Sequence, residues 1–185
     1  MMNLESFRSY RKIDLLVIVA LAFIWALITW ITNIPDNQFT FFLSLFITTM
    51  FMAFTALLIR KLGAVTLFYL FAALISIPIN NLGGLGFYKV PILFIAAIIF
   101  ELFFLLLKKE IKNIPLDVVL GAAFSNFSIP FTMLLFIPAT KELMSFVWNF
   151  ALIAFILGIM ASIMAFLAWY NIKNLKPIIK FEYST

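Results

Sequence analysis

The sequence contains no cysteine and no histidine. The chain therefore has no disulfide bridge and no thiol nucleophile, and it lacks the imidazole and thiolate ligands on which zinc, nickel and copper sites depend. The absence of histidine also removes the Ser-His pair and the H-E-x-x-H motif. No Walker A pattern is present to bind phosphate. We expect neither an enzyme nor a cofactor in this chain.

Charged residues are also scarce, at 11% of the chain, whereas hydrophobic residues make up 65%. Soluble domains average about 25% charged residues and roughly half apolar residues. An aqueous fold cannot bury this much apolar surface, so the bilayer must act as the solvent. We expect one integral membrane domain over residues 1–185, in the cell membrane, and no soluble domain. Basic residues lie at the ends of apolar runs, which does not favour nucleic-acid binding.

Six apolar runs are long enough to be read as transmembrane helices. Open sheets leave backbone groups unpaired in lipid, and outer-membrane strands alternate polar residues far more often, so helices are the expected structure. The first run is too long for a cleavable signal peptide. In the fifth run, SNFSIP at 125–130 predicts an interruption. The predicted spans are about 13–32, 39–59, 63–79, 90–107, 116–137 and 143–170.

The distribution of lysine and arginine predicts the orientation. Eleven of the thirteen lie at the N-terminus, in the 60–61 turn, in the 108–112 loop or in the C-terminal tail, and only Lys89 and Lys141 lie on the other side. Cytoplasmic loops of membrane proteins carry the excess of basic residues. We therefore expect both termini to be cytoplasmic.

Glu101 lies inside the apolar run 92–109. An ionisable residue at this depth is costly, so it is a functional-site hypothesis by default. In one interpretation its carboxylate contacts an amine or aminopyrimidine ligand, or binds a proton. In the other, the acid is hydrogen-bonded to a neighbouring helix or extends toward Lys108. The residue pattern leaves both interpretations open.

Asn126 lies mid-span, four residues before Pro130. Proline removes a backbone donor, so the carbonyl of Asn126 is left without its helical partner and is free to line a cavity. Asparagine also links membrane helices through hydrogen bonds. Asn149 is a candidate for the same cavity. Trp148 is either a ligand-stacking residue or part of the interfacial aromatic belt.

Asn80 and Tyr88 flank the glycine-rich loop at 83–86. They contact a ligand if this loop is a lid over an outward-facing pocket, and not if it is a solvated turn. In the first span, Ala22 and Ala26 form a small-residue face that lets another helix approach closely. In the sixth span, the small residues around Gly158 favour packing within the bundle.

The architecture and several short motifs resemble the substrate-binding (S) component of energy-coupling factor (ECF) transporters. FTALLIRKLGAVTLFYLFAALISIPINNLGG is similar to a region of the YkoE-type branch, in which a basic pair followed by Gly-Ala opens the third span. Arg60, Lys61, Gly63 and Ala64 match this pattern. Glu101 falls where that branch carries a glutamate in the fourth span. The glycine-rich entry that usually precedes this glutamate is replaced here by IAAIIF.

The resemblance implies an all-α, six-helix S-component bundle that takes up a vitamin or precursor, associated in that branch with thiamine or its hydroxymethylpyrimidine precursor. Partners would be the transmembrane coupling protein and two ATPase subunits, which use the ATP. Ala22 and Ala26 are similar to the alanine motif by which S components dock on the coupling protein. Substrate-binding candidates are Glu101, Asn126, Asn149, Asn80, Trp148 and Tyr88.

Two other classes of protein fit the same residues. The first is a non-transport membrane scaffold or assembly factor whose polar residues only join helices. The second is a proton-coupled carrier working alone, although such carriers usually have more spans and internal repeats.

Overall fold

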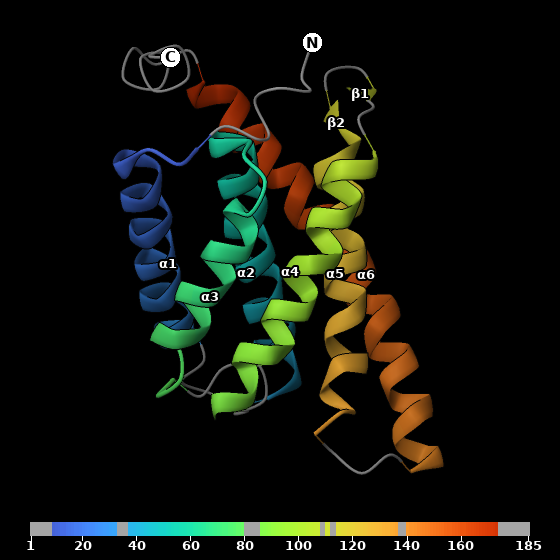
Figure 1. Cartoon of the computed structure of the whole chain (residues 1–185). Coiled ribbons are helices and arrows are strands. Elements are labelled where there is room, and N and C mark those ends of the chain that lie inside the picture. Colours follow the sequence, from blue (N-terminus) through green and yellow to red (C-terminus); the bar gives the residue numbers. More distant parts are fainter. Residues whose placement is uncertain are drawn as a thin grey trace.

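In a computed structural model of the chain, residues 9–32, 37–79, 86–107, 110–111, 114–136 and 140–173 are described. These residues form six α-helices, one 3₁₀ turn and one short antiparallel hairpin (Figure 1). The elements are α1 (Lys12–Thr32), α2 (Gln38–Ile59), α3 (Ala64–Ile75), η2 (Gly86–Tyr88), α4 (Lys89–Leu106), β1 (Glu110–Ile111), β2 (Ile114–Pro115), α5 (Leu116–Met133) and α6 (Lys141–Ile172).

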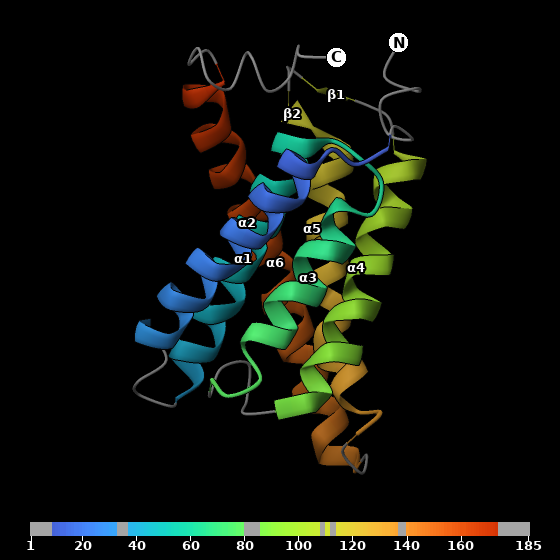
Figure 2. The ribbon, with the colours of Figure 1, turned by 60° about the vertical axis from the view of Figure 1, so that its left-hand side comes forward.

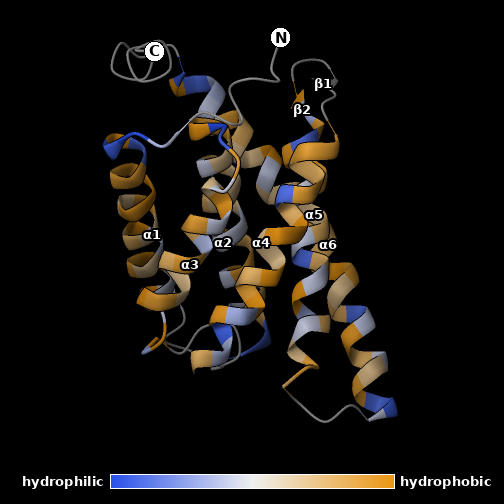
Figure 3. Ribbon diagram, viewed as in Figure 1, coloured by the Kyte–Doolittle hydropathy of each residue, from blue (hydrophilic) through white to orange (hydrophobic). Residues whose placement is uncertain are grey.

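Five of these helices, α1, α2, α4, α5 and α6, are long and apolar enough to cross a membrane. Hydrophobic residues prevail along them, as Figure 3 shows. The chain is therefore a multi-pass membrane protein, as expected from its composition. The predicted helix positions agree with the structure to within a few residues, except for the third span and the end of the fifth.

The third span is the main departure from the sequence prediction. We expected a helix over 63–79, but α3 has only 12 residues and ends at Ile75. Twelve residues rise about 18 Å, whereas the hydrocarbon core is about 30 Å thick. A turn at 76–78 follows. Proline disfavours the helical conformation of the residue before it, so Pro78 ends the helical run although the sequence stays apolar.

The predicted interruption of the fifth span is also wrong, because α5 continues through Pro130 to Met133. Local hydroxyl groups bond to the backbone around the proline: Ser128 Oγ donates to the carbonyl of Ser125 at 2.7 Å, and Thr132 Oγ1 to that of Ile129 at 2.8 Å. Neither hydroxyl bonds to the carbonyl of Asn126, which Pro130 leaves without its helical donor. The helix therefore continues past Pro130 with that helical hydrogen bond missing.

The helices form one bundle with a distinct order of neighbours. α5 packs between α4 and α6, α2 packs against α6, and α1 contacts only α2 and α3 extensively. α1 begins and α6 ends at the same end of the bundle, which we call the terminal end; the opposite end is the distal end (Figures 1 and 2). α3 and α4 run antiparallel, so the start of α3 and the last turns of α4 both lie toward the terminal end.

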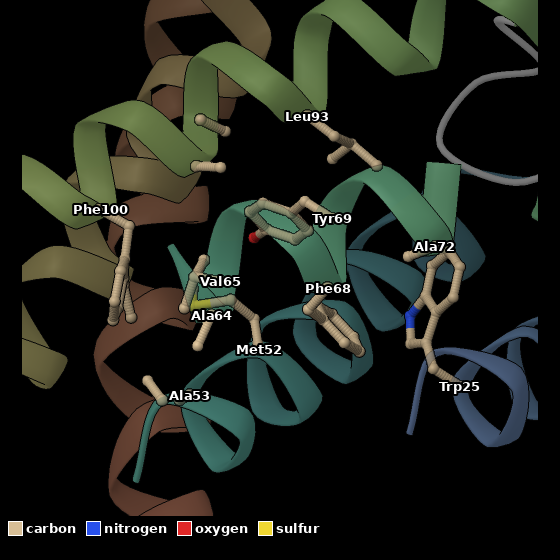
Figure 4. Packing of buried hydrophobic residues seen from close by; sticks show 14 of the residues in the cluster. Trp25, Met52, Ala53, Ala64, Val65, Phe68, Tyr69, Ala72, Leu93 and Phe100 are labelled. Carbon is tan, nitrogen blue, oxygen red and sulfur yellow. The ribbon is translucent and has the colours of Figure 1, made fainter. Parts of the chain in front are cut away.

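The core lies where α1, α2, α3 and α4 meet. Trp25 of α1 packs edge-to-face on Phe68 of α3, with ring centroids 6.4 Å apart, and its indole N–H donates to Thr48 Oγ1 of α2 at 2.9 Å. Tyr69 of α3 lies between the helices near Leu93 of α4 (Figure 4). All of these side chains are fully buried. This core fixes α3 against α4, and the candidate site is built on that pair.

Candidate functional site

Glu101 of α4 binds the N-terminus of α3. Its Oε1 accepts hydrogen bonds from the backbone N–H groups of Val65 (3.2 Å) and Thr66 (3.4 Å). The first turn of any helix leaves such N–H groups without an intrahelical partner, and the helix dipole attracts negative charge there. Glu101 is only 8% exposed. Its carboxylate thus caps another helix, and its second oxygen, Oε2, is buried without a hydrogen-bond partner among the described residues.

Lys89, at the start of α4, binds the opposite end of α3. Its Nζ donates to the carbonyl of Ser76 at 2.8 Å and to that of Ile79 at 2.5 Å. The side chain is 1% exposed. A cation is favourable at a helix C-terminus, where carbonyl groups lack partners. Lys89 and Glu101 therefore place opposite charges on opposite ends of the α3 dipole, and we call this arrangement the α3 clamp.

The spacing of the clamp follows from helix geometry. Glu101 lies twelve residues after Lys89, and α3 is twelve residues long. At 1.5 Å per residue, both distances are about 18 Å. Because α3 and α4 run antiparallel and have the same rise per residue, the two charged side chains of α4 lie opposite the two ends of the shorter α3.

The turn that leads into α3 requires its glycine. Gly63 has φ +86° and precedes the first helical residue, Ala64. A side chain there would be strained, and its Cβ would lie 3.3 Å from the Tyr10 hydroxyl. That hydroxyl donates to the carbonyl of Leu62 at 2.6 Å. Burial raises the pKa of the Tyr10 phenol, and the carboxylates of Glu101 and Asp14 raise it further, so the phenol stays protonated and remains a donor.

The basic pair before this glycine joins two further helices to the turn. Lys61 Nζ lies 2.5 Å from Asp14 Oδ2 in the first turn of α1, and it also donates to the carbonyl of Ser9 at 3.0 Å. Arg60 Nη2 lies 3.4 Å from Asp117 Oδ2 in the first turn of α5. Both pairs lie at the terminal end, so the turn between α2 and α3 holds the ends of α1 and α5 together.

Asn126 links three helices in the middle of the bundle. Its Oδ1 accepts a hydrogen bond from Thr49 Oγ1 of α2 at 2.7 Å, and its Nδ2 donates to the carbonyl of Ala154 of α6 at 3.4 Å. The side chain is fully buried. Its amide therefore makes the interhelical contacts expected of asparagine in a membrane bundle.

Three of the remaining substrate-binding candidates, Trp148, Asn149 and Tyr88, lie at exposed positions. Trp148 of α6 is 51% exposed and packs edge-to-face on Phe131, with centroids 5.0 Å apart. Asn149 is exposed on the same helix, and Tyr88 is exposed at the distal end. Asn80 lies outside the described residues. Glu101, by contrast, is buried, and the binding role of all these residues stays a prediction.

Ala22 and Ala26 are covered by the chain itself. Ala22 is fully buried and Ala26 is 4% exposed. The docking interpretation expects an exposed alanine face on the first span. The structure contradicts that exposure, because both alanines are buried. The small-residue spacing is used instead for internal packing of α1. The docking role of these two alanines remains a prediction.

The sequence interpretation missed the role of Lys89, which it used only as a charge at the end of a span. The sequence gives no sufficient signal for it, because the twelve-residue length of α3, which matches the separation of Lys89 from Glu101, is known only from the structure. No family model matches this sequence, and neither the curated proteins nor the solved structures contain a match to it.

Proposed function

We propose that this chain is the membrane substrate-binding subunit of an ECF-type importer for a vitamin or precursor, thiamine or its hydroxymethylpyrimidine part being the first candidates. One observation carries the proposal. The segment 60–64 and the distant Glu101 each resemble the YkoE-type branch separately, and Glu101 accepts hydrogen bonds from Val65 and Thr66, the two residues that directly follow this segment. The two parts of the sequence that carry this resemblance are therefore next to each other at the start of α3.

The two carboxylate oxygens of Glu101 differ in their hydrogen-bond partners, and this difference supports a ligand contact. Oε1 is used by the backbone of α3, whereas Oε2 accepts no hydrogen bond from the described residues although it is buried. A buried acceptor without a partner is unfavourable by about 1–3 kcal/mol. An amino group of an aminopyrimidine would satisfy it, and such a charge-assisted contact is strong in a low dielectric.

A membrane scaffold is the second candidate function, and a specific observation favours it. Glu101 and Asn126, the two candidates buried in the bundle, both bond to neighbouring helices. These contacts are those expected if polar residues only join helices. Under this alternative no small molecule binds, and exchange of Glu101 alters stability alone.

A binding assay on the purified chain separates the two functions. Thiamine and hydroxymethylpyrimidine are titrated into the wild-type protein, Glu101→Gln and Glu142→Gln. Glu142 is the matched control, because it is exposed in the first turn of α6. The importer proposal predicts that Glu101→Gln weakens binding at least tenfold while Glu142→Gln leaves it unchanged. Equal affinity in both variants removes Glu101 from the site, and mass spectrometry that finds no co-purifying small molecule, together with no binding, favours the scaffold.

A further inference from the structure

Three aromatic side chains with a polar ring atom lie toward the distal ends of three different spans. Trp30 lies in the last turn of α1, Tyr88 immediately precedes α4, and Trp148 lies two turns into α6. Each of these side chains is more than half exposed. Three separate spans therefore present the same kind of side chain at one end of the bundle.

The bundle contacts the apolar rings of these residues and leaves their polar atoms open. Trp148 packs on Phe131 with ring centroids 5.0 Å apart, and Tyr88 packs on Phe136 at 4.8 Å. None of the three aromatic side chains makes a hydrogen bond with another described residue. An unpaired donor is costly in hydrocarbon, and an exposed ring is costly in water. Both costs are avoided where hydrocarbon meets the hydrated lipid headgroups, and Trp and Tyr are enriched at that level.

The opposite ends of α1 and α6 lie about one bilayer thickness away. The exposed Lys12 and Trp30 are 18 residues apart on α1, which is about 27 Å of helix. On α6, Trp148 and Tyr170 are 22 residues apart, which is about 33 Å. The hydrocarbon core of a bilayer is about 30 Å thick. Lys173 Nζ lies 3.9 Å from the centroid of the Tyr170 ring, and basic and aromatic residues together are typical of a membrane interface.

We propose that Trp30, Tyr88 and Trp148 bind the headgroup region of the bilayer on the distal side. Lys12 and Tyr170 mark the opposite boundary, on the terminal side. Between these two levels the exposed surface of the bundle contacts acyl chains. This assigns the three aromatic residues to lipid rather than to a solute or a protein partner, and it does not depend on the proposed transport function.

The placement has consequences for α6 and for Glu101. α6 has seven residues before Trp148, and they rise about 10 Å beyond the distal boundary. They include the exposed Lys141 and Glu142, which would be costly in hydrocarbon. On α4, Glu101 follows Tyr88 by 13 residues, so it lies about 20 Å below the distal boundary. Glu101 is therefore nearer to the terminal boundary than to the distal one.

Spin labels test these depths, because the chain contains no native cysteine that would react with the label. Three variants carry the label in place of an aromatic residue: Trp30→Cys, Tyr88→Cys and Trp148→Cys. Three controls carry it in place of an isoleucine that is exposed nearer the middle of the same helix: Ile24→Cys, Ile98→Cys and Ile156→Cys. The proteins are placed in vesicles of dioleoylphosphatidylcholine. The depth of each label follows from its collision rates with oxygen, which concentrates in hydrocarbon, and with a water-soluble nickel chelate.

We expect the three aromatic positions to lie at the level of the headgroups. Each control should lie deeper by the rise of the helix between the two positions, which is about 9 Å on α1, 15 Å on α4 and 12 Å on α6. Equal depths within a pair overturn the proposal. An aromatic position that collides with neither reagent also overturns it, because a bound protein or solute would then cover that position.

A second measurement keeps the native side chain in place and covers a labelled variant that does not fold. Trp30→Phe and Trp148→Phe each remove one indole and retain an apolar ring. The fluorescence that each change removes from the wild-type signal should be quenched more strongly by a nitroxide on the lipid headgroup than by one on carbon 12 of the acyl chain. The reverse order refutes the assignment.

Discussion

Replacing Glu101 by alanine tests the α3 clamp most directly. The change leaves the N–H groups of Val65 and Thr66 without their acceptor, and Val65 is buried. Two backbone donors lose their acceptor, and a buried donor without a partner costs about 1–3 kcal/mol. We therefore expect a loss of about 3 kcal/mol in the free energy of unfolding.

The conservative variant separates the hydrogen bonds from the charge. Glutamine at position 101 keeps a carbonyl oxygen where Oε1 lies, so it retains the cap and loses only the attraction of a carboxylate for the helix dipole, about 1 kcal/mol. For chains of this size 1 kcal/mol corresponds to a Tm shift of about 2–4 °C. The expected shifts are about 6–12 °C for Glu101→Ala and about 2–4 °C for Glu101→Gln.

The assay is thermal unfolding of detergent-purified protein without added ligand, followed by intrinsic tryptophan fluorescence. Glu142→Ala serves as the control, because Glu142 is exposed and caps no other helix in the described structure. If Glu101→Ala unfolds within 2 °C of the wild type, the carboxylate does not hold α3. The reasoning from the clamp would then be wrong, whatever the ligand-binding result.

Two further predictions concern the other end of the clamp and the packing of α6. Lys89→Met removes the donor to the carbonyls of Ser76 and Ile79. We expect it to lower the Tm in the same assay by about as much as Glu101→Ala does. An unchanged Tm would show that these carbonyls have other partners. Gly158→Ala places a Cβ 2.8 Å from the backbone of α5. Overpacking of this kind typically costs about 1–3 kcal/mol, so the variant should yield less monodisperse protein in size-exclusion chromatography, whereas the exposed Ala168→Leu should behave as wild type.

The positions of the long helices are predictable from sequence because the bilayer imposes one length and one polarity on every span. The length of α3 is not predictable in this way. Its apolar run continues through residue 79, and a hydropathy sum cannot distinguish a helix that ends at Ile75 from one that continues. Pro78 is the local stop signal. The carbonyls of Ser76 and Ile79 accept hydrogen bonds from the ammonium of Lys89, a contact that the sequence does not reveal.

The environment of Glu101 was predictable only in part. Its burial follows from its place in an apolar run, and so does its need for a partner. Among charged side chains the sequence offers no partner at that depth. The partner is the backbone of another helix, and a backbone N–H group becomes available only where a helix begins. The sequence shows the start of that helix as Gly63-Ala64, but not that the acid points toward it.

The spacing of Ala22 and Ala26 shows a similar limit. Small residues four apart predict that a helix approaches closely, but the pattern does not say whether the approaching helix belongs to the same chain. Both side chains are covered within this bundle. The sixth span is the contrasting case: packing within the bundle was favoured there, and Gly158 does lie against the backbone of α5.

The short length of α3 and the burial of Glu101 have one common physical explanation. A helix that ends inside the bilayer leaves unpaired N–H and C=O groups where water cannot reach them, and each such group is costly. A charged side chain at the same depth is costly for the same reason. Placing Glu101 and Lys89 on the two ends of α3 satisfies both requirements in one arrangement.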